Sequence, residues 1–273
     1  MKKHSVLKAA ALTAAAYTVS LRGRTKHPDL EILRRCRFAH RGYHDKPVVP
    51  ENSLPAFRRA IEHGWGSELD VHLMKDGTLA VIHDSSLLRT AGADVQIEDL
   101  TREELENYRL EGTDERIPLF DEVLALFENT TPLIIELKAA NGNHFALSKA
   151  VCERLDSYKG VFCIESFDPM VVADVRELRP GICRGQLAEN FLKDKGALDP
   201  VRSVLATGLI GNALTKPDFI AFKFEDRSCV SNALCLKLWG IQGVAWTLRS
   251  KHDLLTAEAE GLIPIFEKFD PEA

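Results

Sequence analysis

The sequence has little that would suit a disulfide-rich secreted protein, a nucleic-acid binder or a disordered chain. Its six cysteines form no C-x-x-C pair, and several lie in apolar runs such as Val161 to Ile164, which indicates buried, reduced thiols. The 35 Lys and Arg are outnumbered by 40 Asp and Glu, so no basic excess is available for a nucleic-acid backbone. No long polar or low-complexity tract occurs, and 45% of the residues are hydrophobic. The composition indicates an ordinary globular protein in a reducing compartment.

The N-terminal segment allows more than one interpretation. Two lysines precede an Ala-rich stretch, residues 9–21, which is shorter than the ~20 apolar residues of a typical membrane span. Residues 1–26 are interpreted as an apolar leader or a membrane anchor, with membrane association through residues 5–21; a cleaved signal peptide is the alternative. Arg22 and Arg24 follow the stretch and would keep an uncleaved anchor's domain on the cytoplasmic side, whereas a signal peptide would imply export.

From residue 37 onward, short β-rich apolar runs alternate with helix-like stretches, a pattern typical of parallel strands buried on both faces. Ser53 and Thr101 are predicted to cap two of the intervening helices. Repeated βα units over about 230 residues predict one domain, residues 37–273, with a TIM (β/α)8 barrel fold. The nine strand candidates are residues 37–40, 68–73, 79–83, 132–138, 161–166, 182–187, 219–222, 244–247 and 262–266.

One connection is too short for a parallel crossover. Five residues separate the second and third strand candidates, whereas a crossover needs a dozen or more. Asp76-Gly77 predicts a two-residue hairpin turn. If each residue before this turn pairs with the corresponding residue after it, Asp70 lies opposite His83. Because side chains alternate along a strand, Glu68 would share their face. The hairpin therefore predicts two carboxylates and an imidazole in one place.

Acidic residues in apolar strands indicate a metal site. Glu68 and Asp70 offer same-face carboxylates about 6–7 Å apart along the strand, close enough to share one cation. Glu136 interrupts another apolar strand, and Lys138 faces the same way. Buried carboxylates need compensating charge, which a divalent cation supplies; a structural ion pair inside the barrel is the alternative. Ligation by oxygen alone favours Mg²⁺ or Ca²⁺.

Two histidines at strand ends indicate proton transfer. His40 ends the first strand candidate and His83 ends the third. A lone histidine in such a position is more often structural, but two imidazoles beside one metal site can provide both the base and the acid of a hydrolysis near neutral pH. Arg41 offers a planar fork for phosphate oxygens, and Gly42 permits close approach of the backbone.

Nine short sequence strings occur in a fixed order along the chain. They are His40-Arg41-Gly42, Pro50-Glu51-Asn52-Ser53, Glu68-Leu69-Asp70, Lys75-Asp76-Gly77, Val81-Ile82-His83-Asp84, Ile117-Pro118-Leu119, Ile135-Glu136-Leu137-Lys138, Ser166-Phe167 and Trp246-Thr247. In this order the strings resemble the glycerophosphodiester phosphodiesterase family, within the PLC-like phosphodiesterase superfamily, over residues 37 to about 270. The resemblance implies a TIM barrel with a small insertion after the strand ending at His83, here about residues 85–116.

The resemblance also implies roles for individual residues. One divalent cation would be bound by three carboxylates, those of Glu68, Asp70 and Glu136. His40 and His83 would act as general acid and base. The expected phosphate contacts are Arg41 and Lys138.

Three further residues are candidate substrate contacts with equally plausible structural roles. Glu51 could orient Arg41 or the metal site, or it could only shape the loop before a helix. Phe167 and Trp246 end strands on the expected active face, where they could wall the leaving-group pocket or simply pack in the core.

The sequence departs from the family pattern at two places. Leu248-Arg249 stands where the family usually has Asn after its Trp-Thr-Val string, and the closing strand ends in Phe266-Glu267 where Thr-Asp is usual. Neither position belongs to the metal or histidine set. We therefore expect these departures to affect substrate choice more than chemistry.

The implied function is metal-dependent hydrolysis of glycerophosphodiesters to sn-glycerol 3-phosphate and an alcohol. Water could attack directly, or a neighbouring glycerol hydroxyl could first form a cyclic phosphate. The alternatives are a lysophospholipase D-like lipid phosphodiesterase and a non-catalytic barrel that binds phosphodiesters. The expected partner is a small-molecule glycerophosphodiester, while the head group and the oligomeric state stay open.

Overall fold

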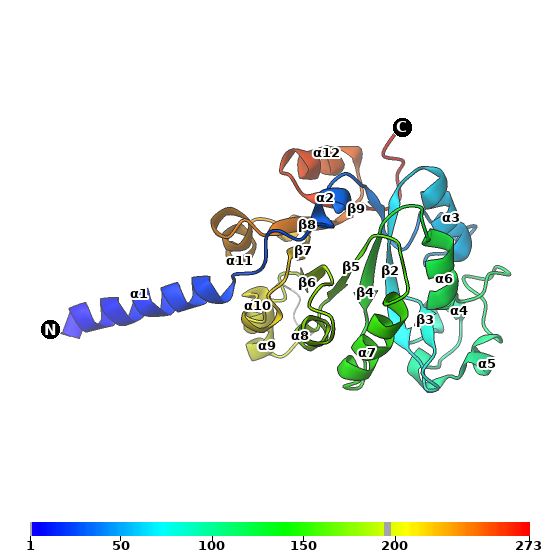
Figure 1. Cartoon of the computed structure of the whole chain (residues 1–273), viewed down its shortest axis with the longest axis horizontal. Coiled ribbons are helices and arrows are strands. Elements are labelled where there is room, and N and C mark those ends of the chain that lie inside the picture. The colour runs from blue at the N-terminus through cyan, green and yellow to red at the C-terminus, as the bar shows by residue number, and fades with distance from the viewer. Residues whose placement is uncertain (1, 194–197) are drawn as a thin grey trace.

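The computed structural model describes residues 2–193 and 198–273. In this part of the chain, eight parallel strands close into a barrel, because β1 pairs with both β2 and β9, and the ninth strand, β3, pairs antiparallel with β2 (Figure 1). The TIM barrel predicted from the sequence is confirmed. The strands are β1 (Phe38–Ala39), β2 (Gly66–Leu73), β3 (Leu79–Val81), β4 (Leu133–Leu137), β5 (Phe162–Ser166), β6 (Arg184–Ala188), β7 (Phe219–Lys223), β8 (Gln242–Leu248) and β9 (Ile263–Phe266).

Helices follow most strands and cover the outside of the barrel (Figure 1). The two predicted caps are present: the Ser53 side chain accepts from the Ala56 N–H, and Thr101 forms a capping box with Glu104. The helices are α1 (Lys2–Ser20), α2 (Leu30–Leu33), α3 (Leu54–Glu62), α4 (Leu88–Ala91), η1 (Ile97–Asp99), α5 (Arg102–Leu105), α6 (Phe120–Phe127), α7 (His144–Leu155), α8 (Pro169–Leu178), α9 (Pro200–Thr207), α10 (Asn212–Thr215), η2 (Phe224–Asp226), α11 (Val230–Ala233), η3 (Leu234–Leu238) and α12 (Lys251–Ala259).

The β2–β3 hairpin has a three-residue loop instead of the predicted two-residue turn. Leu73 of β2 pairs with Leu79 of β3, and the Met74 N–H donates to the Thr78 carbonyl oxygen at 2.8 Å, which leaves residues 75–77 as the loop. Gly77 has a left-handed φ of 86°. The predicted register, with Asp70 opposite His83, is therefore wrong by one residue. Instead the Ile82 N–H donates to the Asp70 carbonyl oxygen at 3.1 Å. His83 lies beyond the end of β3, so the alternation of side chains along the strand no longer determines the direction of its side chain.

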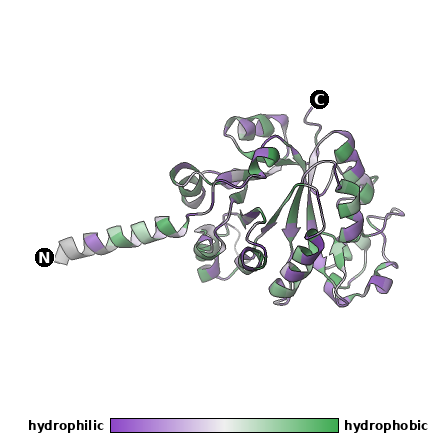
Figure 2. Cartoon of the chain, in the orientation of Figure 1, coloured by the Kyte–Doolittle hydropathy of each residue, from purple (hydrophilic) through white to green (hydrophobic). Residues whose placement is uncertain are grey.

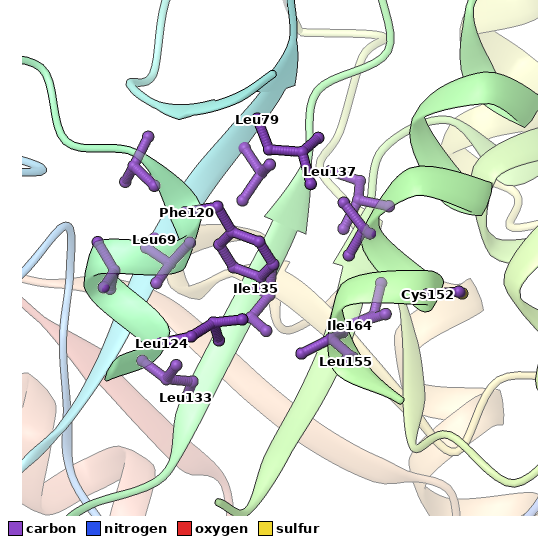
Figure 3. Close-up of a cluster of buried hydrophobic side chains, with 14 of the residues drawn as sticks. Leu69, Leu79, Phe120, Leu124, Leu133, Ile135, Leu137, Cys152, Leu155 and Ile164 are labelled. Carbon is purple, nitrogen blue, oxygen red and sulfur yellow. The ribbon is translucent and has the colours of Figure 1, made fainter. Parts of the chain in front are cut away.

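Side-chain alternation separates an apolar outer face of the barrel from its lumen. On β2 and β4 the residues that face outward are Leu69, Ile135 and their neighbours of the same parity. They pack against Phe120 of α6 and Leu155 of α7, and Figure 3 shows this core between sheet and helices. The residues between them along the same strands consequently point into the lumen.

The lumen is apolar at one end and acidic further along. Leu30 and Leu33 of α2 pack with Ile134 and Cys163 and close the end at which the strands begin. One step along the strands, Asp70, Glu136 and Glu165 lie in register on β2, β4 and β5. The acidic layer therefore lies towards the carboxyl ends of the strands, where TIM-barrel enzymes place their active sites.

The segment between β3 and α6 has a small core of its own, which includes Ile97, Leu105 and Ile117. It is tied to the barrel through His72 of β2: Nδ1 of His72 lies 2.6 Å from a Glu98 oxygen, and Nε2 lies 3.1 Å from the His83 carbonyl oxygen. His72 is buried and holds the backbone at His83.

Candidate active site

Three buried carboxylates converge inside the barrel. Glu68 and Asp70 project from β2 and Glu136 from β4, and each offers an oxygen within 4.8 Å of the other two. Strand alternation places Glu68 and Asp70 on one face, while the β2–β4 register sets Glu136 beside Asp70. The three residues predicted from the sequence as metal ligands are thus brought together by two neighbouring strands.

The charges around these carboxylates are incompletely balanced. Burial, together with the negative charges of Asp70 and Glu136, raises the pKa of Glu68 well above its usual value. Burial also raises the pKa of Glu136 to about 7, although Lys138 opposes the shift. For Asp70, burial acts in the same direction, but the cations nearby, Lys138 first, hold its pKa below the usual range. Since all three offer hard oxygen ligands, the set fits a divalent cation.

Two cations and one amide border the acidic residues. The Lys138 Nζ lies 2.8 Å from a Glu136 oxygen and 3.0 Å from Asp70 Oδ1. The Arg41 backbone N–H donates to a Glu68 oxygen at 3.0 Å, and its guanidinium Nε lies 3.5 Å from Asp70 Oδ2. Asn52 donates its side-chain N–H to the same oxygen at 2.8 Å. Arg41 and Lys138 therefore lie where a phosphate on the cation would need positive charge.

The backbone around Arg41 takes an unusual form. Arg41 itself has a φ of 56°, and Gly42 follows with a φ of 78°. A Cβ on Gly42 would lie 2.8 Å from the Ala56 Cβ, closer than two carbons can approach. The glycine at this position is required for both its φ and its close packing, and it allows the Arg41 N–H to point at Glu68.

His40 contacts a carboxylate, that of Glu267, which is not among the predicted site residues. Its Nδ1 lies 2.8 Å from Glu267 Oε2, and its Nε2 lies 3.9 Å from a Glu68 oxygen. Although burial raises the pKa of Glu267, the hydrogen bond from His40 and the positive charge of Arg249 hold it far below its usual value. Because an ionised carboxylate can only accept, Nδ1 carries the proton and Nε2 is free to accept one.

The two departures from the family pattern thus meet at one place. Arg249 Nε donates to Glu267 Oε1 at 2.7 Å, while Glu267 holds His40. The sequence placed Glu267 outside the metal and histidine set, whereas in the structure it contacts His40 directly. His44 is also buried, and its Nε2 lies 3.8 Å from Glu267 Oε2. The sequence contained a signal for this contact. Glu267 directly follows the last strand and His40 directly follows the first strand, and these two strands are neighbours in a closed barrel.

His83 also has a carboxylate partner at Nδ1. Its Nδ1 lies 2.5 Å from Asp84 Oδ1, and Asp84 in turn accepts from Arg89 Nε at 2.5 Å. Burial lowers the pKa of His83, and the positive charges of Lys138 and Arg41 add to this effect, while Asp70 opposes it. Burial likewise lowers the pKa of His40, to about 4. Both rings are close enough to Asp70 to be affected by its charge.

Glu51 lies between the two histidine regions. One of its oxygens accepts from Arg41 at 3.0 Å and from Arg89 at 2.6 Å, and the other pairs with Lys46. Three cations hold the pKa of this carboxyl far below its usual value in spite of burial. In this arrangement Glu51 fixes the guanidinium of Arg41, while Arg89 connects it to Asp84 and His83.

Two aromatic residues lie at the carboxyl ends of β5 and β8. The rings of Phe167 and Trp246 meet edge to face with centroids 5.7 Å apart, and Phe191 contacts Phe167 at 6.1 Å. Phe167 and Trp246 are only partly buried and lie at the active-site end of the barrel. They form an apolar wall at the carboxyl ends of these two strands.

One acidic residue of the lumen was missed in the sequence. Glu165 on β5 is 1% exposed, and among the described residues its Oε2 has no hydrogen-bond partner. Burial and the neighbouring charge of Glu136 raise the pKa of Glu165 well above its usual value. Its place in the apolar string Val161 to Ser166 could have revealed it, by the same reasoning that identified Glu136.

Comparisons with known proteins agree with this site. The sequence model of the glycerophosphoryl diester phosphodiesterase family matches residues 40–266. A glycerophosphodiester phosphodiesterase of Caldanaerobacter subterraneus is 37% identical over 161 residues, 55% of this chain and 65% of the relative. The human lysophospholipase D GDPD1 is 38% identical over 121 residues, 40% of this chain and 37% of the relative. The matched stretch therefore covers less than two thirds of these curated relatives.

Solved structures share the fold over most of their length. A glycerophosphodiester phosphodiesterase of Thermotoga maritima has a TM-score of 0.63 at 27% identity, over 85% of this chain and 94% of the other. A phosphodiesterase of Oleispira antarctica, solved with the product sn-glycerol-3-phosphate, has a TM-score of 0.67 at 23% identity, over 85% and 92%. With the family match spanning most of the barrel, the chain belongs to the glycerophosphoryl diester phosphodiesterase family.

Proposed function

We propose that the chain hydrolyses glycerophosphodiesters to sn-glycerol 3-phosphate and an alcohol. The observation that carries the proposal is the convergence of three buried carboxylates within 4.8 Å, bordered by two histidines that each have a carboxylate at Nδ1. Binding alone would not need paired proton carriers, so this arrangement argues against a non-catalytic barrel. The names of the relatives above support the same reaction.

Glu68, Asp70 and Glu136 would hold the cation, Mg²⁺ or Ca²⁺, by oxygen ligation. The bound cation would supply positive charge to a phosphate oxygen. Arg41 and Lys138 lie beside these carboxylates and would offset the charge that develops on the phosphoryl group.

The two histidines would divide the proton transfers. His40 is the more deeply buried, and its Nε2 is left unprotonated by the hydrogen bond that Glu267 accepts from Nδ1. We assign it the role of base towards the attacking water or glycerol hydroxyl. His83 is more accessible, and Asp84 would stabilise its protonated form, so it would donate the proton to the leaving alkoxide.

The test is an assay of the metal-reconstituted protein against glycerophosphocholine, glycerophosphoethanolamine and glycerophosphoglycerol, with release of sn-glycerol 3-phosphate as the readout. We expect turnover that EDTA abolishes and that Mg²⁺ or Ca²⁺ restores. No release from any of the three diesters with either metal would refute the proposal.

A second candidate substrate is a lysophospholipid. The human relative named lysophospholipase D favours it, because its matched stretch is as similar to this chain as that of the bacterial enzyme. The Phe167–Trp246 wall could accommodate an apolar group. A higher kcat/KM for lysophosphatidylcholine than for glycerophosphocholine would favour this candidate over the first.

We also propose that the catalytic domain lies on the cytoplasmic side. All six cysteines, which fall within the described residues, are free, as expected in a reducing compartment. A fusion of the C-terminus to a reporter that is active only in the cytoplasm tests this orientation, and reporter activity only outside the cytoplasm would contradict it.

A further inference from the structure

Exposed aliphatic side chains gather around the point where α1 meets the barrel. Of the sixteen large hydrophobic residues that are exposed in the described chain, nine lie on α1 and on the segments α9–α10 and α11–η3. The other seven are distributed over the rest of the surface. We call the nine residues the aliphatic face; they are Leu12, Val19, Val201, Val204, Leu205, Ile210, Leu214, Val230 and Leu238.

Hydrogen bonds make these segments one continuous surface. The Tyr17 hydroxyl of α1 donates to the Gly208 carbonyl oxygen at 3.1 Å, directly after α9. The Trp239 indole N–H donates to the Thr18 carbonyl oxygen at 2.6 Å, next to η3. The Ser231 hydroxyl of α11 donates to a carbonyl at the end of α9 at 2.7 Å. Figure 1 shows α9, α10 and α11 grouped at the base of α1, so the elements that carry the aliphatic face are neighbours in space.

The same segments carry charge of one sign. Residues 1–28, 200–217 and 227–243 contain ten of the chain's 35 Lys and Arg and none of its 40 Asp and Glu. The rest of the chain therefore has 25 cationic and 40 acidic residues. These segments therefore carry net positive charge on a protein that is acidic overall, and the acidic partners of Arg24, Arg202 and Arg227 lie outside them, at Asp218, Asp199 and Glu260.

A cavity beside the aliphatic face is lined by several of these cations. It has a volume of about 790 Å³ and includes Arg22, Lys26 and Trp239 in its lining. The Arg22 guanidinium lies 5.7 Å from the centroid of the Trp239 ring, at the level where α1 leaves the barrel. An indole and cations next to aliphatic side chains are what proteins present to the boundary between lipid tails and head groups.

We propose that the chain docks on an anionic membrane surface through the aliphatic face, with α1 lying against the lipid and the basic residues contacting the head groups. None of the described helices is long and apolar enough to cross a membrane. Figure 2 shows that α1 is hydrophobic mainly in its C-terminal half. One weak apolar segment binds a membrane only marginally, and a second contact of apolar or basic residues makes the binding stable. The α9–α11 segments provide that second contact.

Two other occupants fit the surface less well. A second copy of the chain would place the same cations against each other in a symmetric interface, which costs free energy. A nucleic acid would need aromatic side chains on which bases can stack, whereas the face is made of Val, Leu and Ile.

The experiment measures binding of the full-length protein to vesicles, independently of turnover. Vesicles of phosphatidylglycerol and phosphatidylcholine in equal parts are compared with vesicles of phosphatidylcholine alone by sedimentation. We expect at least about tenfold tighter partition into the anionic vesicles, weakening with added salt. The double variant Val204→Asp/Leu214→Asp should lower that partition by about tenfold or more, since two aliphatic contacts would be replaced by anions.

A matched control changes two equally exposed hydrophobic residues elsewhere, as Phe145→Asp/Leu255→Asp, and should leave the partition unchanged. Should the first double variant unfold, Arg22→Glu/Lys26→Glu on exposed residues outside α9 and α10 tests the same face, and the partition should again fall. Equal binding to both vesicle types, or wild-type binding by these two test variants, would overturn the proposal. So would a dimer in sedimentation velocity that Val204→Asp/Leu214→Asp disperses, or binding to RNA in preference to vesicles.

Discussion

Glu267 offers a test of how His40 is activated. Its carboxylate lies 2.8 Å from His40 Nδ1 in a site where Glu267 itself is 8% exposed. A charge-assisted hydrogen bond of this kind contributes about 1.5–3 kcal/mol. Glu267→Gln should therefore lower kcat about 10–100-fold, since each 1.4 kcal/mol corresponds to a factor of about ten. KM should change much less, because the hydrogen bonds of Glu267 go to His40 and Arg249 and not to the metal ligands.

The assay is steady-state release of sn-glycerol 3-phosphate across pH. Loss of the negative charge removes an interaction that raises the pKa of His40, so the acid limb of kcat/KM should move to lower pH in Glu267→Gln. Glu267→Asp keeps the charge and should retain more activity than Glu267→Gln. The control is Glu260→Gln, an exposed residue whose carboxylate pairs with Arg227 at 3.6 Å. A kcat for Glu267→Gln within about twofold of wild type would refute the reasoning.

Three further outcomes are expected. Alanine at His40 or His83 should abolish turnover with an unchanged circular dichroism spectrum; normal activity in either variant would contradict the acid–base assignment. Without metal, Tm should rise on addition of Mg²⁺ or Ca²⁺, because the cation offsets three buried carboxylates, and Glu136→Gln should reduce that rise. In the metal-free protein, lowering the pH from 7 to 5 should destabilise the wild type by about 2 kcal/mol relative to His40→Asn. The pKa of His40 is about 4 when folded and about 6.5 when unfolded, so the unfolded wild-type chain binds a proton that the folded chain does not. Urea denaturation of both proteins at the two pH values measures this difference, from which the opposite effect of the buried carboxyl groups, shared by both proteins, is subtracted.

The sequence was sufficient for the order of elements because local patterns determine them. All nine strands predicted from apolar runs are present, each within two residues of its predicted bounds. The register of the β2–β3 hairpin was not recoverable in the same way. Asp76-Gly77 fits both a two-residue turn and a three-residue loop that ends in a left-handed glycine, and only packing selects between them.

Within the site, residues on one strand were easier to place than partners from distant strands. Glu68 and Asp70 follow from alternation along β2, whereas the contact of His40 with Glu267 joins residues 227 positions apart. The roles of Glu51 and His72 depend on which cations and carbonyls surround them, and that is a property of the folded loops. A sequence pattern alone carries no such information.

The closure of the barrel has a consequence for when activity can first arise. β1 pairs with β9, and the His40 N–H donates to the Phe266 carbonyl oxygen at 2.9 Å, so the seam between the first and last strands also brings Glu267 to the histidine. During synthesis the last strand leaves the ribosome long after the first. Until it docks, the imidazole lacks the carboxylate that sets its tautomer. Hydrolysis should consequently appear only with the completed barrel, which makes turnover a sensitive report of full folding.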